Sequence, residues 1–194
     1  SRRQRILGLA NKLMQLTRGR KLSVQSINVI EAVDGVQNGF AQLAEQFGLE
    51  PFSNWACPDP ENRLPSSWRV GQTSGGIASG LSHLDVARWA RQINKEYVLV
   101  MEDDCVISDL ASSWTYFESC FFDANEFIPD WHMLMLGAAG HRVDIASPLA
   151  IPESTCIEIA GFSYLTTMYF LSPKGAIFLD NARPHCLENG LAFD

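Results

Sequence analysis

Three consecutive carboxylates follow a short apolar run in the middle of the chain, in the sequence VLVMEDDC. Residues 98–101 form the apolar run, and Glu102, Asp103 and Asp104 follow it directly. Charges this close repel one another unless solvent or a bound cation screens them. Mg²⁺ and Mn²⁺ favour oxygen ligands and are often held by one or two carboxylates together with substrate phosphates. The stretch therefore predicts either a divalent-metal site that handles phosphates or solvated acids that cap the next helix.

The elements around the acidic run indicate where in a fold it would lie. Residues 77–94 have helical spacing of apolar side chains, and a strand at 97–101 follows at once. The apolar residues of that strand do not alternate with polar ones, which is typical of a parallel strand covered on both faces. In such sheets ligands bind beyond the carboxyl ends of the strands, where the three acids would lie.

The remaining segments also alternate between helix and strand. Further helices are expected at residues 2–16, 40–47, 111–122 and from the sequence SPKGAIFLDNA onward. Further strands are expected at residues 24–33, which end at the turn Asp34-Gly35, and at 131–136 and 164–171. Residues 51–76 are rich in Pro, Asn, Ser and Gly and predict a long loop. This order predicts an α/β fold with a doubly wound, mostly parallel sheet.

Composition and charge argue against one class of function and indicate the compartment of the protein. The chain of 194 residues is 46% apolar and 19% charged, as expected for a folded protein with one sizeable domain or at most two small ones. A net charge of -7 argues against a general nucleic-acid binder, although seven of the fifteen Lys and Arg residues fall in the first 21 positions. Five scattered cysteines, no signal segment and no apolar run long enough to span a bilayer predict a cytoplasmic protein, or one of the ER lumen if an upstream signal peptide is missing.

Six short motifs, in order along nearly the whole chain, resemble glycosyltransferase family 25. They are RRQR at 2–5, EAVDG at 31–35, GGIASGLSHL at 75–84, VLVMEDD at 98–104, WHMLMLG at 131–137 and YFLSPKGAIFL at 169–179. The resemblance implies a GT-A type nucleotide-diphospho-sugar transferase fold with a mostly parallel sheet flanked by helices. It further implies that residues 1–194 form a single transferase domain that lacks its first strand and its C-terminal part.

The resemblance also implies a reaction and its partners. A hexose, commonly galactose, would pass with inversion from a UDP-sugar to a saccharide or glycoprotein acceptor. The acidic run would be the metal motif, with Asp104 and Glu102 as ligands of Mn²⁺ or Mg²⁺ and Asp103 helping through water or the ribose. A divalent ion that bridges the diphosphate stabilises the charge left on the departing nucleotide.

Other positions that match the family have two readings each. Arg3 and Arg5, with Arg2, would lie near the nucleotide phosphates or form a solvated helix face. Asp34 would contact the base or ribose, or serve as a plain turn residue. Ser82 and His83 would line the donor site or satisfy structural hydrogen bonds inside a helix. Lys174 and Gly175 are expected to start a helix.

The catalytic candidates are Asp194 as general base and His83, with Asp130 and Asp180 as weaker options for the base. Gly76 occupies a position where family members usually carry Glu. This substitution keeps open a second interpretation, a non-catalytic module that binds sugar nucleotides. A metal-dependent phosphohydrolase is a further alternative, because such enzymes also place acids at strand ends.

Overall fold

The computed structural model describes residues 2–34, 74–94, 96–137, 149–150, 154, 157–159 and 167–189. The chain divides into two compact units, each made of two segments. The first unit comprises Ser1–Ile30 and Asn94–Ala176, and the second comprises Glu31–Ile93 and Ile177–Asp194. The acidic run therefore belongs to the first unit, and the Ser82-His83 pair belongs to the second.

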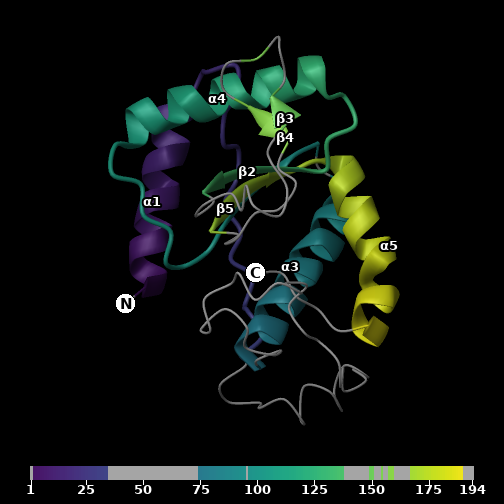
Figure 1. Ribbon diagram of the computed structural model, residues 1–194. Coiled ribbons are helices and arrows are strands. Elements are labelled where there is room, and N and C mark those ends of the chain that lie inside the picture. The colour runs from purple at the N-terminus through teal and green to yellow at the C-terminus, as the bar shows by residue number, and fades with distance from the viewer. Residues whose placement is uncertain are drawn as a thin grey trace, which may run out of the picture. The chain divides into compact units, whose positions relative to one another are not determined.

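The described elements make a mixed α/β fold (Figure 1). The helices are α1 (Arg2–Thr17), α3 (Ser74–Ile93), α4 (Leu110–Phe127) and α5 (Pro173–Asn189). The strands are β1 (Val98–Met101), β2 (Met133–Gly137), β3 (Leu149–Ala150), β4 (Glu158–Ile159) and β5 (Met168–Leu171). These bounds confirm the helices expected at 2–16, 77–94 and 111–122, the helix that begins at SPKG, and the strands at 97–101 and 131–136. Of the strand expected at 164–171, residues 168–171 form β5, and residues 164–166 lie outside the described residues. The helix expected at 40–47 lies outside the described residues, as does nearly all of the loop at 51–76.

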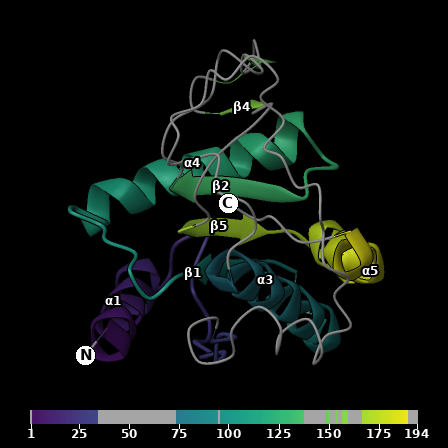
Figure 2. The same ribbon diagram turned by 60° about the horizontal axis from the view of Figure 1, so that its bottom comes forward.

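The main sheet has the order β1-β5-β2, with β5 in the middle (Figure 2). Both ladders are antiparallel, with Leu99 opposite Phe170 on one side and Leu134 opposite Phe170 on the other. The smaller ladder between β3 and β4 is antiparallel too. The expected mostly parallel sheet is therefore not found among the described strands, because the chain returns through β5 in the reverse direction between β1 and β2.

The strand at 97–101 was also expected to be covered on both faces, and the structure does not show this. All four residues of β1 are only partly buried, whereas all four residues of β5 are buried. A strand in the middle of a sheet is shielded by neighbours on both edges, and β5 holds that place. A run of apolar residues without alternation therefore predicts correctly that a strand is present. It does not show which strand is central or in which direction the neighbouring strands run.

One face of the sheet forms the core of the first unit. Met168 and Phe170 point to this face, since alternate strand residues share a face. They belong to a cluster that includes Leu13 of α1 and residues of α4, among them Trp114 and Phe121. Phe121 packs edge-on against Phe170, with ring centroids 5.2 Å apart. In Figure 1, α4 runs across the sheet, and its buried aromatic residues pack against this face.

Residues 24–33, expected as a strand, form no strand in the structure. Two of the backbone N–H groups in this segment donate to side chains rather than to a ladder. Val24 donates to Oγ1 of Thr17 at 3.0 Å, and Val33 donates to Oγ of Ser82 at 2.9 Å. A run of β-branched residues becomes a strand only where a partner strand satisfies its backbone. Side-chain hydroxyls satisfy these two groups instead.

In the second unit, ion pairs connect α3 with α5. Arg183, which is 7% exposed, donates from Nη1 to Oδ1 of Asp85 at 2.7 Å. Asp180 accepts from Nε of Arg88 at 3.3 Å and from Nη1 of Arg91 at 2.8 Å. None of the described helices is both long and apolar enough to cross a membrane.

Replacing Gly175 with alanine is expected to destabilise the protein by about 1–3 kcal/mol. A Cβ atom at this position would overlap the carbonyl of His132, with the carbonyl carbon 2.8 Å away, and would lie 2.9 Å from Cδ1 of Leu171. Chemical denaturation of Gly175→Ala measures the loss. Gly8→Ala is the matched control, because a Cβ there meets nothing within 4 Å and alanine favours the helix. Equal stability of Gly175→Ala and the wild type would contradict the close packing of α5 against His132.

Asp85→Ala is expected to lower the free energy of unfolding by about 1–3 kcal/mol, because it leaves the buried Arg183 guanidinium without its carboxylate. The double variant Asp85→Ala/Arg183→Met should lose less than Asp85→Ala alone, since the orphaned charge is then gone. Urea denaturation of the two variants checks this order. If the double variant is the less stable of the two, the cost lies in lost packing of the arginine stem.

Candidate functional site

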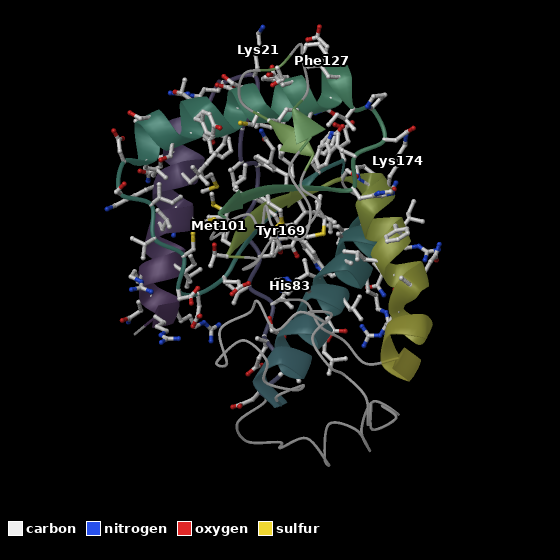
Figure 3. All side chains as sticks on the ribbon, viewed as in Figure 1. Lys21, His83, Met101, Phe127, Tyr169 and Lys174 are labelled. Carbon is white, nitrogen blue, oxygen red and sulfur yellow. The ribbon has the colours of Figure 1, made fainter. Side chains whose placement is uncertain are left out.

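The strand β1 carries the acidic run to the edge of the main sheet. Figure 3 labels Met101, the last residue of β1, from which Glu102 continues. The Glu102 N–H donates to the carbonyl of Thr167 at 3.0 Å, which extends the pairing with the β5 segment by one residue. The Cys105 N–H then donates to the carbonyl of Glu102 at 3.2 Å and closes a turn that contains Asp103 and Asp104. Backbone bonds on both sides thus fix this turn.

The carboxylates of the turn face solvent to different degrees. Asp103 and Asp104 are exposed, Glu102 is partly buried, and Cys105 is buried. Burial raises the pKa of the Cys105 thiol, the charges of Asp104 and Glu102 raise it further, and Arg5 lowers it. Burial, followed by the charge of Glu102, also raises the pKa of Tyr169 on β5. The turn therefore produces a negative potential that a bound cation would reduce.

These acids do not cap the next helix. Asp109 fills that role, since its Oδ1 accepts hydrogen bonds from the N–H groups of Ala111 and Ser112, both at 3.1 Å. Bonds from the Ser112 hydroxyl and N–H lower the pKa of Asp109, as expected for a carboxylate at an N-cap. The capping interpretation of the run at 102–104 is therefore wrong, and solvation or ligand binding remains.

Arginine side chains from α1 lie beside the turn. Nη2 of Arg5 donates to the backbone carbonyl of Asp103 at 3.2 Å, and Nη1 of Arg2 lies 4.0 Å from Oδ1 of Asp103. The side chains of Arg2 and Asp103 are 72% and 60% exposed, so this ion pair contributes little stability. Arg3, on the same helix, is exposed. The structure thus brings the predicted basic cluster and the predicted acidic run together within one unit.

The residues of the turn fit a hard divalent cation of the kind that takes part of its ligands from a substrate. Among the described residues no group of three or more His, Cys, Asp or Glu side chains converges as a preformed metal cage would. Mg²⁺ sites that act on phosphates commonly use only one or two carboxylates, with water and phosphate oxygens as the other ligands. The exposed Asp104, with Glu102 two residues before it, offers the oxygen donors that such a site needs.

A cavity of about 380 Å³ opens beside Asp104. It is lined by Asp104, Cys105, Val106, Ile107, Ser108, Ser113, Phe117, Leu136, Thr167 and Met168. Because β1 and β2 are each antiparallel to β5, they run in the same direction, and their carboxyl ends lie at the same end of the sheet. The cavity lies at that end, where ligand sites were expected from the sequence.

A β-bulge shapes one wall of this cavity. Met135 lies opposite Tyr169 and Gly137 lies opposite Met168, so Leu136 is an extra residue in β2. Bulges bend the strand and redirect a side chain, and they are frequent near functional sites. Here the bulged residue, Leu136, lines the cavity.

The family-matched candidates for contact with the donor, Ser82, His83 and Asp34, lie in the second unit. Ser82 accepts from the Val33 N–H and donates to the carbonyl of Ala78 at 2.7 Å, which gives its hydroxyl a structural role next to Asp34. His83 is 6% exposed and lies on α3, as Figure 3 shows. Asp34 is exposed. Their proposed contact with the donor stays a prediction.

The candidate general bases have different surroundings. Asp130 forms an ion pair with Lys174, and the hydrogen bond and charge of this lysine lower the pKa of Asp130, which weakens it as a base. Asp180 is held by Arg88 and Arg91. Asp194 lies outside the described residues. Lys174 and Gly175 fall in the first turn of α5, as expected.

Sequence reasoning missed most of the cavity wall. Residues 105–108 follow the acidic run directly, so their position was within reach of the sequence. Ser113 and Phe117 are four residues apart, and helical spacing places them on one face of α4. Thr167 and Leu136 depend on the strand pairing and on the bulge, and neither has a local sequence signal.

Comparisons with known proteins give no match to this chain. No family model matches the chain, and no curated protein sequence and no solved structure matches it either. What the chain does must therefore be inferred from its own residues and their geometry.

Proposed function

We propose that this chain is a metal-dependent hexosyltransferase domain, similar to glycosyltransferase family 25, that moves a hexose from a UDP-sugar to a saccharide or glycoprotein acceptor. The observation that carries the proposal is the end of β1, where Glu102, Asp103 and Asp104 reach the edge of the sheet beside Arg2 and Arg5. Carboxylates for a cation and guanidinium groups for phosphate lie together there. This is the combination that a nucleoside diphosphate requires.

The charges of the site support a role in the departure of a diphosphate. Asp104 and Glu102 would hold Mn²⁺ or Mg²⁺, which when bound supplies Lewis-acid stabilisation of the leaving group. Arg5, already turned toward the backbone of Asp103, would donate to a phosphate oxygen as a second source of positive charge. The exposed and loosely paired Arg2 could follow it at small energetic cost.

An inverting transfer also needs a base that removes the proton from the attacking hydroxyl. Asp194 remains the proposed base, because the arginine and lysine partners of Asp180 and Asp130 make these two residues less suitable. His83 remains a second proposal, as a group that contacts the donor.

A non-catalytic module that binds sugar nucleotides is the second candidate function. Gly76 favours it, since this residue in the first turn of α3 stands where the family usually has Glu. Such a module would use the same acidic turn and the same arginines. Binding and turnover must therefore be measured separately.

Thermal unfolding with Mn²⁺, with UDP and with both is expected to show a rise in Tm only when both ligands are present. At ligand concentrations a hundredfold above Kd, a protein of this size should gain roughly 5–10 °C. Asp104→Ala should abolish the gain, because it removes an oxygen ligand of the metal. Glu126→Ala on the exposed surface of α4 is the control and should keep it.

A wild-type Tm that does not respond to Mn²⁺ and UDP together would refute the metal-diphosphate site. An unchanged gain in Asp104→Ala would refute the role of this residue. Release of UDP from UDP-hexoses then separates the two candidate functions, since binding without turnover supports the non-catalytic module.

A further inference from the structure

The basic residues of the chain are concentrated in α1 and in the loop that follows it. Seven of the fifteen Lys and Arg residues fall within the first 21 positions, and no acidic residue precedes Glu31. All 22 acidic residues therefore lie after residue 30, together with the other eight basic residues. The net charge of -7 is thus the sum of a cationic N-terminal segment and an acidic remainder. Such a separation of charge favours anionic partners at the cationic segment.

One side of α1 is polar along its length. The opposite side carries the buried Leu13 and packs against the core of the first unit. The polar side follows the helical spacing of three and four residues, and every residue of it is exposed. We call it the α1 polar face, and it consists of Gln4, Gly8, Asn11, Lys12, Gln15 and Arg18. It offers a partner two cations and three side-chain amides, with no acid and no apolar side chain.

The two cations of this face have no carboxylate partner in the part of the chain that the structure describes. Neither Lys12 nor Arg18 forms an ion pair there, whereas Arg20 pairs with Glu118 of α4 at 3.5 Å. Lys12 and Arg18 are six residues apart, which corresponds to about 9 Å along the helix axis. Two carboxylates of a single polypeptide segment can therefore pair with both cations.

Gly8 lies within the α1 polar face, and the fold itself does not require a glycine there. Gly19 is the glycine with a positive φ among the described residues, so the backbone at position 8 suits any residue. A Cβ atom on Gly8 would meet nothing within 4 Å, so packing does not require glycine either. Glycine inside a helix is less stable than alanine. A close approach of another backbone to the helix at this point would explain the choice.

The surroundings of the face favour an acidic polypeptide over other anionic partners. A bilayer or a nucleic-acid duplex is wide, and its phosphates would also come near the exposed Asp103, which lies beside the same helix through Arg2 and Arg5. The apolar side of α1 packs in the core and is not free to enter a bilayer. The face has no aromatic side chain on which a base could stack. A second copy of the chain fits poorly, because three acidic residues of its described helices already pair with arginines.

We propose that the α1 polar face binds an acidic polypeptide segment of another protein, with carboxylates of the segment paired to Lys12 and Arg18 and its backbone close to Gly8. The side-chain amides of the face supply hydrogen bonds to the same segment. The inference does not depend on the proposed function, because it uses Lys12 and Arg18, whereas Arg2 and Arg5 contact the acidic turn.

Fluorescence anisotropy with the full chain and a labelled peptide of repeated Glu-Ala pairs tests the contact, with a Gln-Ala peptide as the neutral control. Lys12→Glu and Arg18→Glu are each expected to weaken binding about two- to fivefold, and the double variant at least about tenfold. Added salt should weaken binding too, because the pairs are exposed. Lys174→Glu makes the same change of charge at an exposed position outside α1 and should bind the peptide like the wild type.

Gly8→Leu tests the close approach separately from charge. The variant should keep or raise the Tm, because leucine favours a helix more than glycine does and the space around position 8 is open. It should nevertheless weaken peptide binding as much as a single charge reversal, since the new side chain fills the place of the peptide backbone. Unchanged binding by Gly8→Leu would overturn the close approach at this residue.

Three results would overturn the acidic partner. The first is a wild-type chain that binds the Glu-Ala peptide no better than the Gln-Ala peptide. The second is tighter binding, through Lys12 and Arg18, of phosphatidylserine vesicles or single-stranded DNA, and the third is a wild-type dimer that the double variant does not form. The double variant should keep the gain in Tm with Mn²⁺ and UDP, so a failure of the proposed function appears in that measurement and not in peptide binding.

Discussion

The burial of β5 between β1 and β2 is the constraint on which the rest of the first unit depends. Every residue of this strand is buried, and its backbone is paired on both edges. A strand in this position must carry apolar side chains on both faces, because any unpaired polar group would have no access to water. Because β5 runs opposite to both neighbours, the carboxyl ends of β1 and β2 lie at the same end of the sheet. The acidic turn and the cavity therefore lie together at that end.

Backbone hydrogen bonds hold the acidic turn in place at the end of β1. The Glu102 N–H donates to the carbonyl of Thr167, and the Cys105 N–H closes the turn, so the backbone keeps three consecutive acidic residues at the end of β1. Arg5 and Arg2 both contact Asp103. Burial is the main cause of the raised pKa values of Cys105 and Tyr169, and nearby acidic charges raise both further. A bound cation would reduce the repulsion among charges that lie this close together.

The sequence was a good guide to elements and to the acidic turn, and a poor one to strand direction. Helical spacing identified α1, α3 and α4, and the apolar run before Glu102 identified β1, because these patterns depend on neighbours along the chain. The antiparallel pairing of β5 could not be predicted, since apolar residues without alternation suit any strand that is covered on both faces. Residues 24–33 have strand-like composition, but the hydroxyls of Thr17 and Ser82 satisfy part of their backbone. The bulge at Leu136 has no sequence signal, because it exists only relative to the partner strand.

Charges of both signs lie together at the acidic turn. Arg2 and Arg5 of α1 both contact Asp103, while Glu102 and Asp104 flank this residue in the sequence. Under the proposed function, the carboxylates would hold a divalent cation, and the guanidinium groups would bind oxygens of the same diphosphate. The negative charge that develops on the departing diphosphate would then lie between two sources of positive charge, the metal ion and Arg5.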